Sequence, residues 1–434
     1  MKYFITTLLC ITAFSNQTNC SSTLQPRNVR IIDKNWVDIN TGKNIILKGP
    51  NVVVKGPPWL PLVEGNTICN DTSTITCKTF NEADAIHITK TMGWNSIRLG
   101  ITWAGGQPID STTLNPIWVK NLHQILTLTD KYNINVILDH HTDMVGSANC
   151  GFGVPMWFSK KASPNLIGKE LETASPFKYM KEFTSMFTLN KPKQCINNRS
   201  AWLENKDDNN YNLVNSCCKG MNSWANNNAL GFTTLAQETL GYLFKKGDGR
   251  DYYCNYFKLL SKELVQHPSA IAIELMNEPV YIERWNMYDT WKQCNDEIIS
   301  VIPDMNVAVA DVGEGAVLPS WLGPNVALSP SITEWLKTSR NLFYAWHWYG
   351  NPKDPLEAIK NVQKIQDKWN MPSMLTETMS CDAMTKAEKA GISWSYWHYS
   401  QYCDTAPAYG GKLPPYSFGA CILGWGDGQS NKRC

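Results

Sequence analysis

The sequence lacks several features that would each point to a different class of protein. Beyond residues 1–20 no apolar run approaches the ~20 residues of a membrane-spanning helix, so no integral membrane span is predicted. Its 40 basic and 38 acidic residues form no long run of like charge, and the formal net charge is only +2. Nucleic acid is therefore not an expected partner. None of the 14 cysteines lies in a Cys-x-x-Cys pair, which argues against the alternative of a zinc site.

The N-terminus resembles a secretory signal peptide, which we place at residues 1–20. Lys2 precedes a mostly apolar stretch, and Ala13-Phe14-Ser15 offers small residues for cleavage. We therefore expect a secreted protein, or one in the lumen of a secretory or lysosome-like compartment, where cysteines pair as disulfides. Sequons that predict a glycoprotein begin at Asn16, Asn19, Asn70 and Asn198.

Apolar, strand-like runs alternate with amphipathic segments along most of the chain, which is typical of parallel strands covered by helices. Eight strands are predicted, at 44–54, 95–99, 135–138, 271–276, 306–311, 342–346, 372–376 and 391–397. Helices are predicted at 81–92, 116–132, 235–244, 251–266, 285–300 and 355–369. Eight strands with intervening helices predict an α/β fold, the (β/α)8 TIM barrel. With no Gly/Ser linker or repeat, residues 21–434 are expected to form one domain.

The alternation breaks after the third strand. Residues 144–250 are rich in Asn, Lys, Cys and Trp and show no regular strand. A loop of this length is unusual in a compact domain unless it is functional or internally braced. We expect an insertion on the catalytic face that is stapled by disulfides, for which the candidates are Cys150, Cys195, Cys217 and Cys218.

Two predicted strands end at a glutamate. The apolar run 271–276 stops at Asn277-Glu278-Pro279, and the strand at 372–376 leads into Glu377. In a barrel of parallel strands, the loops at the carboxyl ends carry the chemistry. The pair therefore predicts a catalytic acid and a nucleophile. The alternative is a helix N-terminus at which Asn277 is the cap and the helix dipole favours Glu278.

At these strand ends the sequence resembles glycoside hydrolase family 5, a group of retaining glycosidases on the TIM barrel. Met276-Asn277-Glu278-Pro279 resembles the family's acid/base motif, and Leu375-Thr376-Glu377 its nucleophile motif. The family's other strand-end positions are matched in order by Arg98, His141, His347-Trp348-Tyr349 and Trp397. This ordered set covers roughly residues 40–405.

Within that family the sequence is similar to the endoglycoceramidases, which release the intact glycan from glycosphingolipids. Residues 51–58 resemble their Asn-Val-Val-x-Lys-x-Pro-Pro motif, and residues 153–157 their Gly-Ala-Pro-x-Trp motif. Residues 138–143 are similar to their Leu-Asp-Met-His-Gln-Asp motif, with His140 in place of Met and Thr142 in place of Gln.

The resemblance implies a role for each matched residue. Glu278 is expected to be the acid/base and Glu377 the nucleophile, with their pKa values shifted in opposite directions. Arg98 and a hydrogen bond from Tyr349 would keep Glu377 ionised. Asn277 is expected to hydrogen-bond the sugar 2-hydroxyl, and His141 and His347 to donate hydrogen bonds in the cleft. Trp397 would be the platform on which the sugar stacks. Lys55 and Asp143 would hold a sugar one unit further from the cleaved bond.

These observations predict a secreted, retaining β-glycosidase that cleaves glycan from ceramide. One alternative is an endo-β-glucanase or β-mannanase, and another is a carbohydrate-binding protein without catalysis. No cofactor or metal is expected, because two carboxylates suffice for the reaction. The expected partners are a glycan or glycolipid substrate and, transiently, membrane lipid, and the protein is expected to be a monomer.

Overall fold

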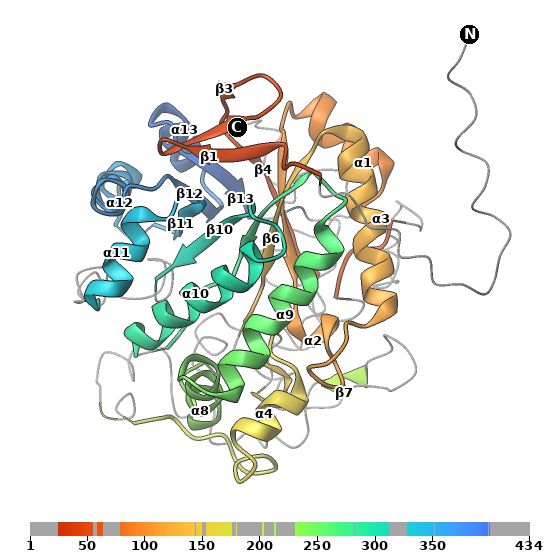
Figure 1. The fold of residues 1–434 in the computed structure, drawn as a ribbon, viewed down its shortest axis with the longest axis vertical. Helices are drawn as coiled ribbons and strands as arrows, with labels where there is room; N and C mark the ends of the chain where they lie inside the picture. Colours follow the sequence, from red (N-terminus) through yellow and green to blue (C-terminus); the bar gives the residue numbers. More distant parts are fainter. Residues whose placement is uncertain are drawn as a thin grey trace, which may run out of the picture.

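A closed barrel of eight strands forms the centre of the molecule, and helices surround it (Figure 1). The computed structural model describes residues 25–54, 59–63, 79–143, 145–149, 153–175, 179, 202–203, 212–213, 231–281, 283–311, 328–350, 352–397 and 399. The barrel strands are β4 (Lys48–Val52), β5 (Ser96–Ile101), β6 (Asn135–His140), β9 (Ala270–Glu274), β10 (Asn306–Ala310), β11 (Leu342–Trp348), β12 (Ser373–Thr378) and β13 (Ser393–Tyr396). Every neighbouring pair is parallel, and β13 pairs with β4 to close the ring. The predicted TIM barrel is confirmed.

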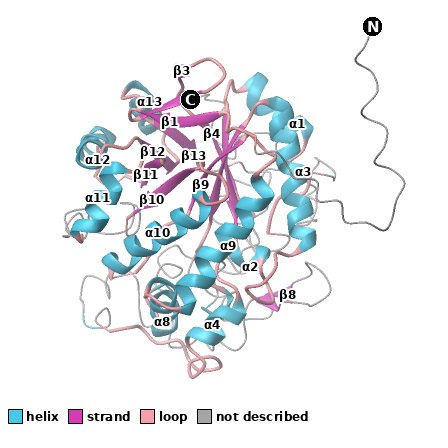
Figure 2. Ribbon diagram, viewed as in Figure 1, coloured by secondary structure: helices cyan, strands magenta, loops and turns pink. Residues whose placement is uncertain are grey.

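The helices lie outside the strands, as the cyan and magenta ribbons of Figure 2 show. They are α1 (Glu82–Ile86), which continues as the π-helix η1 (His87–Thr91), α2 (Trp103–Gly106), α3 (Pro116–Tyr132), α9 (Asp248–Leu264), α10 (Arg284–Ile299), α11 (Pro330–Thr338), α12 (Pro355–Trp369) and α13 (Cys381–Lys389). The bounds predicted for α3 and α12 match the structure. Each of these two helices begins with a side-chain cap followed by proline and ends at an asparagine with φ of 53°, so both ends are encoded locally.

The first predicted strand is wrong at its start. Residues 43–44 belong to a separate antiparallel sheet made of β1 (Val29–Ile32), β2 (Asn35–Asp38) and β3 (Lys43–Asn44). This sheet packs under the barrel, where Trp36 meets Phe343 edge-on with ring centroids 4.9 Å apart. Because residues 45–47 are also apolar, the sequence shows no break between the sheet and β4.

The segment 144–250 carries helices that pack into the main core. It contains η2 (Ser147–Asn149), α4 (Met156–Ala162), the short pair β7 (Trp202–Leu203) and β8 (Asn212–Leu213), and α8 (Thr234–Phe244). Buried Trp103 of α2 contacts Trp157 and Phe158 of α4 as well as Tyr253 and Tyr256 of α9. Aromatic packing of this kind holds α4 against α2 and α9. The four cysteines predicted as staples lie outside the described residues.

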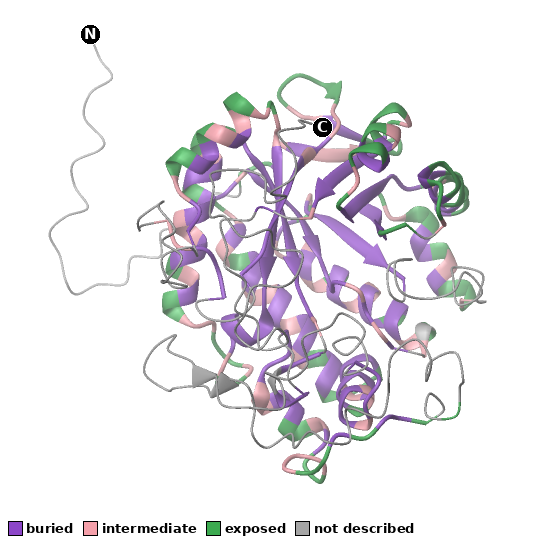
Figure 3. Cartoon of the chain, turned by 180° about the vertical axis from the view of Figure 1, so that it is seen from behind, coloured by how far each residue is buried: buried purple, intermediate pink, exposed green. Residues whose placement is uncertain are grey.

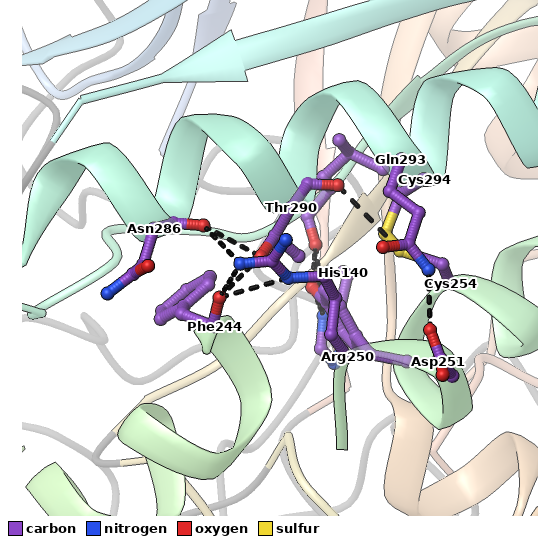
Figure 4. Close-up of a disulfide and its surroundings, with 11 residues drawn as sticks. His140, Phe244, Arg250, Asp251, Cys254, Asn286, Thr290, Gln293 and Cys294 are labelled. Carbon is purple, nitrogen blue, oxygen red and sulfur yellow. Dashed lines mark hydrogen bonds between the residues drawn. A yellow bond between two sulfur atoms is a disulfide. The ribbon is translucent and has the colours of Figure 1, made fainter. Parts of the chain in front are cut away.

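A disulfide joins two neighbouring helices. Cys254 of α9 is bonded to Cys294 of α10, and Thr290 lies beside it (Figure 4). The prediction that cysteines pair is confirmed for these two. Figure 3 shows that the barrel strands are buried, whereas exposed residues lie on the outer helices. Among the described residues, no helix has both the length and the apolar character to cross a membrane.

Candidate active site

The side chains predicted for the site converge at the carboxyl ends of the barrel strands. Arg98 lies on β5, and His347 and Glu377 are register partners on β11 and β12. The register between these two strands shifts between Trp346 and His347, and such an irregularity redirects side chains at the rim of a barrel. The remaining members follow strand ends: His141 and Asp143 after β6, Asn277 and Glu278 after β9, Tyr349 after β11, and Trp397 after β13. Lys55 lies outside the described residues.

Glu377 is buried and surrounded by hydrogen-bond donors. Arg98 Nη1 donates to Oε1 at 2.7 Å, and the Tyr349 hydroxyl donates to Oε2 at 2.8 Å. Burial favours the neutral acid, but the charges of His347, Arg98 and His141, together with the hydrogen bond from Tyr349, lower the pKa of Glu377 to about 2. The carboxylate is therefore ionised at neutral pH, as expected from the sequence.

Arg98 is fully buried and contacts two further carboxylates. Its Nε and Nη2 donate to Glu274 at 2.8 and 2.7 Å, and Nη2 also lies 3.1 Å from Asp139. Burial opposes the charge, but Asp139, Glu274 and Glu377 hold the pKa of Arg98 above its usual value. The planar guanidinium carries several N–H donors, and these contacts fix its orientation.

Sequence reasoning missed Glu274 and Asp139, as well as Asn51, which accepts from Arg98 Nη1 at 2.8 Å. A signal was present for Glu274, which interrupts the apolar run from Ala270 to Met276. All three residues are buried. A charged residue inside a buried strand needs a partner.

Glu278 lies in an irregular loop with a left-handed backbone, at φ of 39°. Its Oε1 is 2.9 Å from Nδ1 of His347, and the same nitrogen lies 3.7 Å from Oε2 of Glu377. One carboxylate oxygen of Glu278 and one of Glu377 lie within 4.8 Å of each other. Carboxyl groups of retaining glycosidases are ~5 to 5.5 Å apart, whereas inverting enzymes need ~6.5 to 9.5 Å to admit a water molecule.

The alternative interpretation of Asn277 as a helix cap is wrong. No helix follows it directly, since α10 begins at Arg284 with Glu283 as its N-cap. The side-chain oxygen of Asn277 accepts from Arg98 Nη2 at 2.9 Å, which fixes the orientation of the amide.

His141 is buried beside a carboxylate and an indole. Its Nδ1 is 2.6 Å from Asp139, and its Nε2 is 3.8 Å from Asp143. Burial opposes the charge, but Asp139, Asp143 and Glu377 raise the pKa of His141. The ring stacks on Trp397, with centroids 5.3 Å apart and planes 12° apart. This stacked contact helps to hold the indole of Trp397 in place.

Glu278, His347 and Glu377 form the one group in the described part of the chain whose side chains could hold a metal ion. A cation there would have to displace the His347–Glu278 hydrogen bond and would lie next to the positive charge of Arg98, which repels it. The group therefore suits proton transfer better than metal binding.

A small pocket that is open to solvent lies beside Glu278. Its polar lining comes from Thr142, Asp143 and Glu278, and its apolar lining from Val145, Val154, Leu240, Met276, Pro279 and Val280. Since Glu377 does not line it, the pocket extends away from the carboxylate pair on the side of Glu278.

A TIM barrel whose strand ends hold two carboxylates at this separation defines the class of the protein, a glycoside hydrolase. The family model described as Cellulase (glycosyl hydrolase family 5) matches residues 63–402, and the chain belongs to this family.

Similar proteins agree with this assignment. An endoglycoceramidase of Hydra vulgaris is 29% identical over 202 residues, which is 46% of this chain and 32% of that protein. Endoglycoceramidase I of Rhodococcus hoagii (strain 103S) is 21% identical over 90% of this chain and 70% of its own length. The matched region thus spans about a third of the Hydra protein.

Solved structures share the fold at low identity. Endo-glycoceramidase II from Rhodococcus sp., solved as its lactosyl-enzyme intermediate, aligns with a TM-score of 0.55 and 16% identity over 86% of this chain and 75% of its own. The crystal structure of endogalactoceramidase aligns with a TM-score of 0.53 and 13% identity over 86% and 74% of the two chains.

Proposed function

We propose that this glycoside hydrolase cleaves its substrate by double displacement, with Glu377 as nucleophile and Glu278 as acid/base. The observation that carries the proposal is the separation of at most 4.8 Å between oxygens of the two carboxylates. That separation leaves room for a covalent glycosyl intermediate and too little for a water molecule between the groups.

In the first step, an oxygen of Glu377 attacks the anomeric carbon while Glu278 gives its proton to the leaving oxygen. The bond from the anomeric carbon to the aglycone breaks, and an ester to Glu377 forms. In the second step, Glu278 removes a proton from water, the water oxygen attacks the anomeric carbon, and the ester breaks to regenerate Glu377. One group can serve as acid and then as base because it loses its proton in the first step.

The surrounding residues support each step. Arg98 and Tyr349 stabilise the ionised nucleophile, and His347 contacts both carboxylates. Trp397 is the proposed platform for the sugar ring, and Asn277 the donor to its 2-hydroxyl. Lys55 and Asp143 remain the predicted contacts to a sugar one unit further away.

For the substrate we propose a glycosphingolipid cleaved between glycan and ceramide. Similar proteins bear the name endoglycoceramidase, and the pocket beside Glu278 has a largely apolar lining. Because the acid/base faces the leaving group, this pocket lies where an apolar aglycone would bind. The description of the matched family as Cellulase favours a second candidate, an endo-β-glucanase or β-mannanase.

We further propose that the protein is secreted or lumenal, monomeric and formed of one domain over residues 21–434, with transient contact to membrane lipid at the catalytic face. Exposed Trp285 and Leu356 lie at the starts of α10 and α12, and exposed Met379 follows β12. These three exposed apolar side chains lie at the carboxyl ends of the barrel strands, the face where contact with lipid is proposed.

The test is hydrolysis of a fluorescent ganglioside, lactosylceramide, β-1,4-glucan and β-mannan, with identification of the released reducing ends. Glu278→Gln and Glu377→Gln are expected to abolish turnover and preserve sugar binding. The control is Glu334→Gln, which changes an exposed glutamate of α11. Near-normal activity of Glu377→Gln would overturn the mechanism, and cleavage of polysaccharide alone would overturn the glycolipid substrate.

A further inference from the structure

Asn277, the residue before Glu278, is held at both its N–H and its carbonyl by residues of the third barrel strand and its loop. The Asn277 N–H donates to the carbonyl of His140 at 3.0 Å. The Thr142 hydroxyl donates to the carbonyl of Asn277, also at 3.0 Å. Both contacts are buried, because His140, Thr142 and Asn277 are at most 7% exposed.

The second contact acts directly on the backbone of Glu278. The Asn277 carbonyl belongs to the peptide plane whose rotation about the N–Cα bond of Glu278 defines φ at that residue. That φ is 39°, a left-handed value which residues other than glycine rarely adopt and which persists only when surrounding contacts enforce it. The Thr142 hydroxyl is such a contact.

Thr142 is itself seated by close packing. Gly153 approaches it with φ of 131°, and a Cβ at Gly153 would lie 2.3 Å from Cγ2 of Thr142. Within the same stretch, Nδ1 of His140 lies 3.1 Å from the carbonyl of Leu275. The end of the third strand therefore supports the whole turn that leads from β9 to Glu278.

We propose that Thr142 is a positioning residue, whose hydroxyl holds the Asn277–Glu278 peptide so that Glu278 reaches the leaving oxygen. This inference rests on the proposed acid/base role of Glu278. It predicts a defect that is greatest where the leaving group needs a proton, because Glu377 is held by contacts from β5 and from β11 and its loop.

The dependence of rate on the leaving group isolates proton donation. A phenol of low pKa leaves without a proton, whereas one of high pKa needs the acid. The probes are aryl β-lactosides or β-cellobiosides, whichever the wild-type enzyme cleaves faster, with phenols of similar size and different pKa. The measured quantity is kcat/KM, which reports formation of the glycosyl-enzyme.

For Thr142→Val, kcat/KM is expected to fall on the order of 10- to 100-fold on the poorest leaving groups and to stay near wild type on 2,4-dinitrophenyl glycosides. Thr142→Ser, which keeps the hydroxyl, is expected to restore most of the loss. The matched control is Thr290→Val, which removes another buried hydroxyl that donates to backbone carbonyls, in α10. An equal loss on all leaving groups, or no loss, would overturn the inference.

Glu278→Ala separates this inference from the proposed function. If Glu278 is the acid, its removal must steepen the leaving-group dependence more than Thr142→Val does. A flat dependence in Glu278→Ala would overturn the proposed function itself. Should Thr142→Val fail to fold, Gly153→Ala provides the second test, because its Cβ displaces Thr142. It must show the same selective loss, and wild-type behaviour would reject the role of Thr142.

Discussion

Arg98 Nη1 lies 2.7 Å from Oε1 of Glu377 although both side chains are buried. The same guanidinium also contacts Glu274 and Asp139, so one side chain contacts three buried carboxylates. A buried charge that loses its partner is costly. The ion pair therefore links the stability of the fold to the protonation state of the proposed nucleophile.

Removing this cation should impair both folding and catalysis. Arg98→Met is expected to lower the free energy of unfolding by about 3 to 5 kcal/mol, because it strands buried carboxylates. Denaturant titration measures the loss, and exposed Arg340→Met is the control. Equal stability of the two variants would contradict the account.

The lowered pKa of Glu377 predicts that stability depends on pH. Its folded value of about 2 lies below the ordinary value of 4.5, so the ionised form stabilises the fold above pH ~4.5 and this contribution is lost as pH falls toward 2. The loss is expected to reach about 3 kcal/mol at most. The free energy of unfolding of wild type and of Glu377→Gln should be measured across this pH range. If it falls with pH at the same rate in both proteins, the pKa of Glu377 is not lowered.

Tyr349→Phe removes the hydrogen bond to Oε2 of Glu377 while keeping the ring. We expect kcat/KM to fall about 10-fold, because a hydrogen bond from a hydroxyl to a charged carboxylate is worth roughly 1.5 to 3 kcal/mol. The acid limb of the pH–rate profile should also move toward higher pH. Tyr132→Phe, at an exposed hydroxyl that contacts Glu82, is the control. An unshifted acid limb would argue against this role for Tyr349.

The Cys254–Cys294 disulfide is expected to stabilise the barrel wall without taking part in catalysis. Changing both cysteines to alanine should lower the free energy of unfolding by about 2 to 4 kcal/mol, because the disulfide links α9 to α10 across 40 residues. Activity at low temperature should be retained. Loss of activity in a folded double variant would show that the disulfide shapes the site.

Sequence patterns predicted the features that local chemistry encodes. The bounds of α3 and α12 follow from their caps, and the pairing of Glu278 with Glu377 follows from two strand ends. Contacts that depend on register could not be predicted in this way. Glu274 and Asp139 meet Arg98 only because three neighbouring parallel strands align, and no local pattern specifies that alignment.

The N-terminal sheet was missed for a related reason. The apolar residues 45–47 carry the chain from β3 into β4 without a break, although β3 pairs with β2 and β4 pairs with β5 and β13. The contacts to the backbone of Asn277, which precedes Glu278, also come from residues distant in the sequence, namely His140 and Thr142.

The most direct test of the central claim is to trap the covalent intermediate. A 2-deoxy-2-fluoro glycoside with a dinitrophenyl leaving group slows both steps, so that the glycosyl-enzyme accumulates and its labelled peptide can be sequenced by mass spectrometry. The account predicts one glycosyl group, attached to Glu377. A label on any other residue, or turnover by an active enzyme that never becomes labelled, would contradict it.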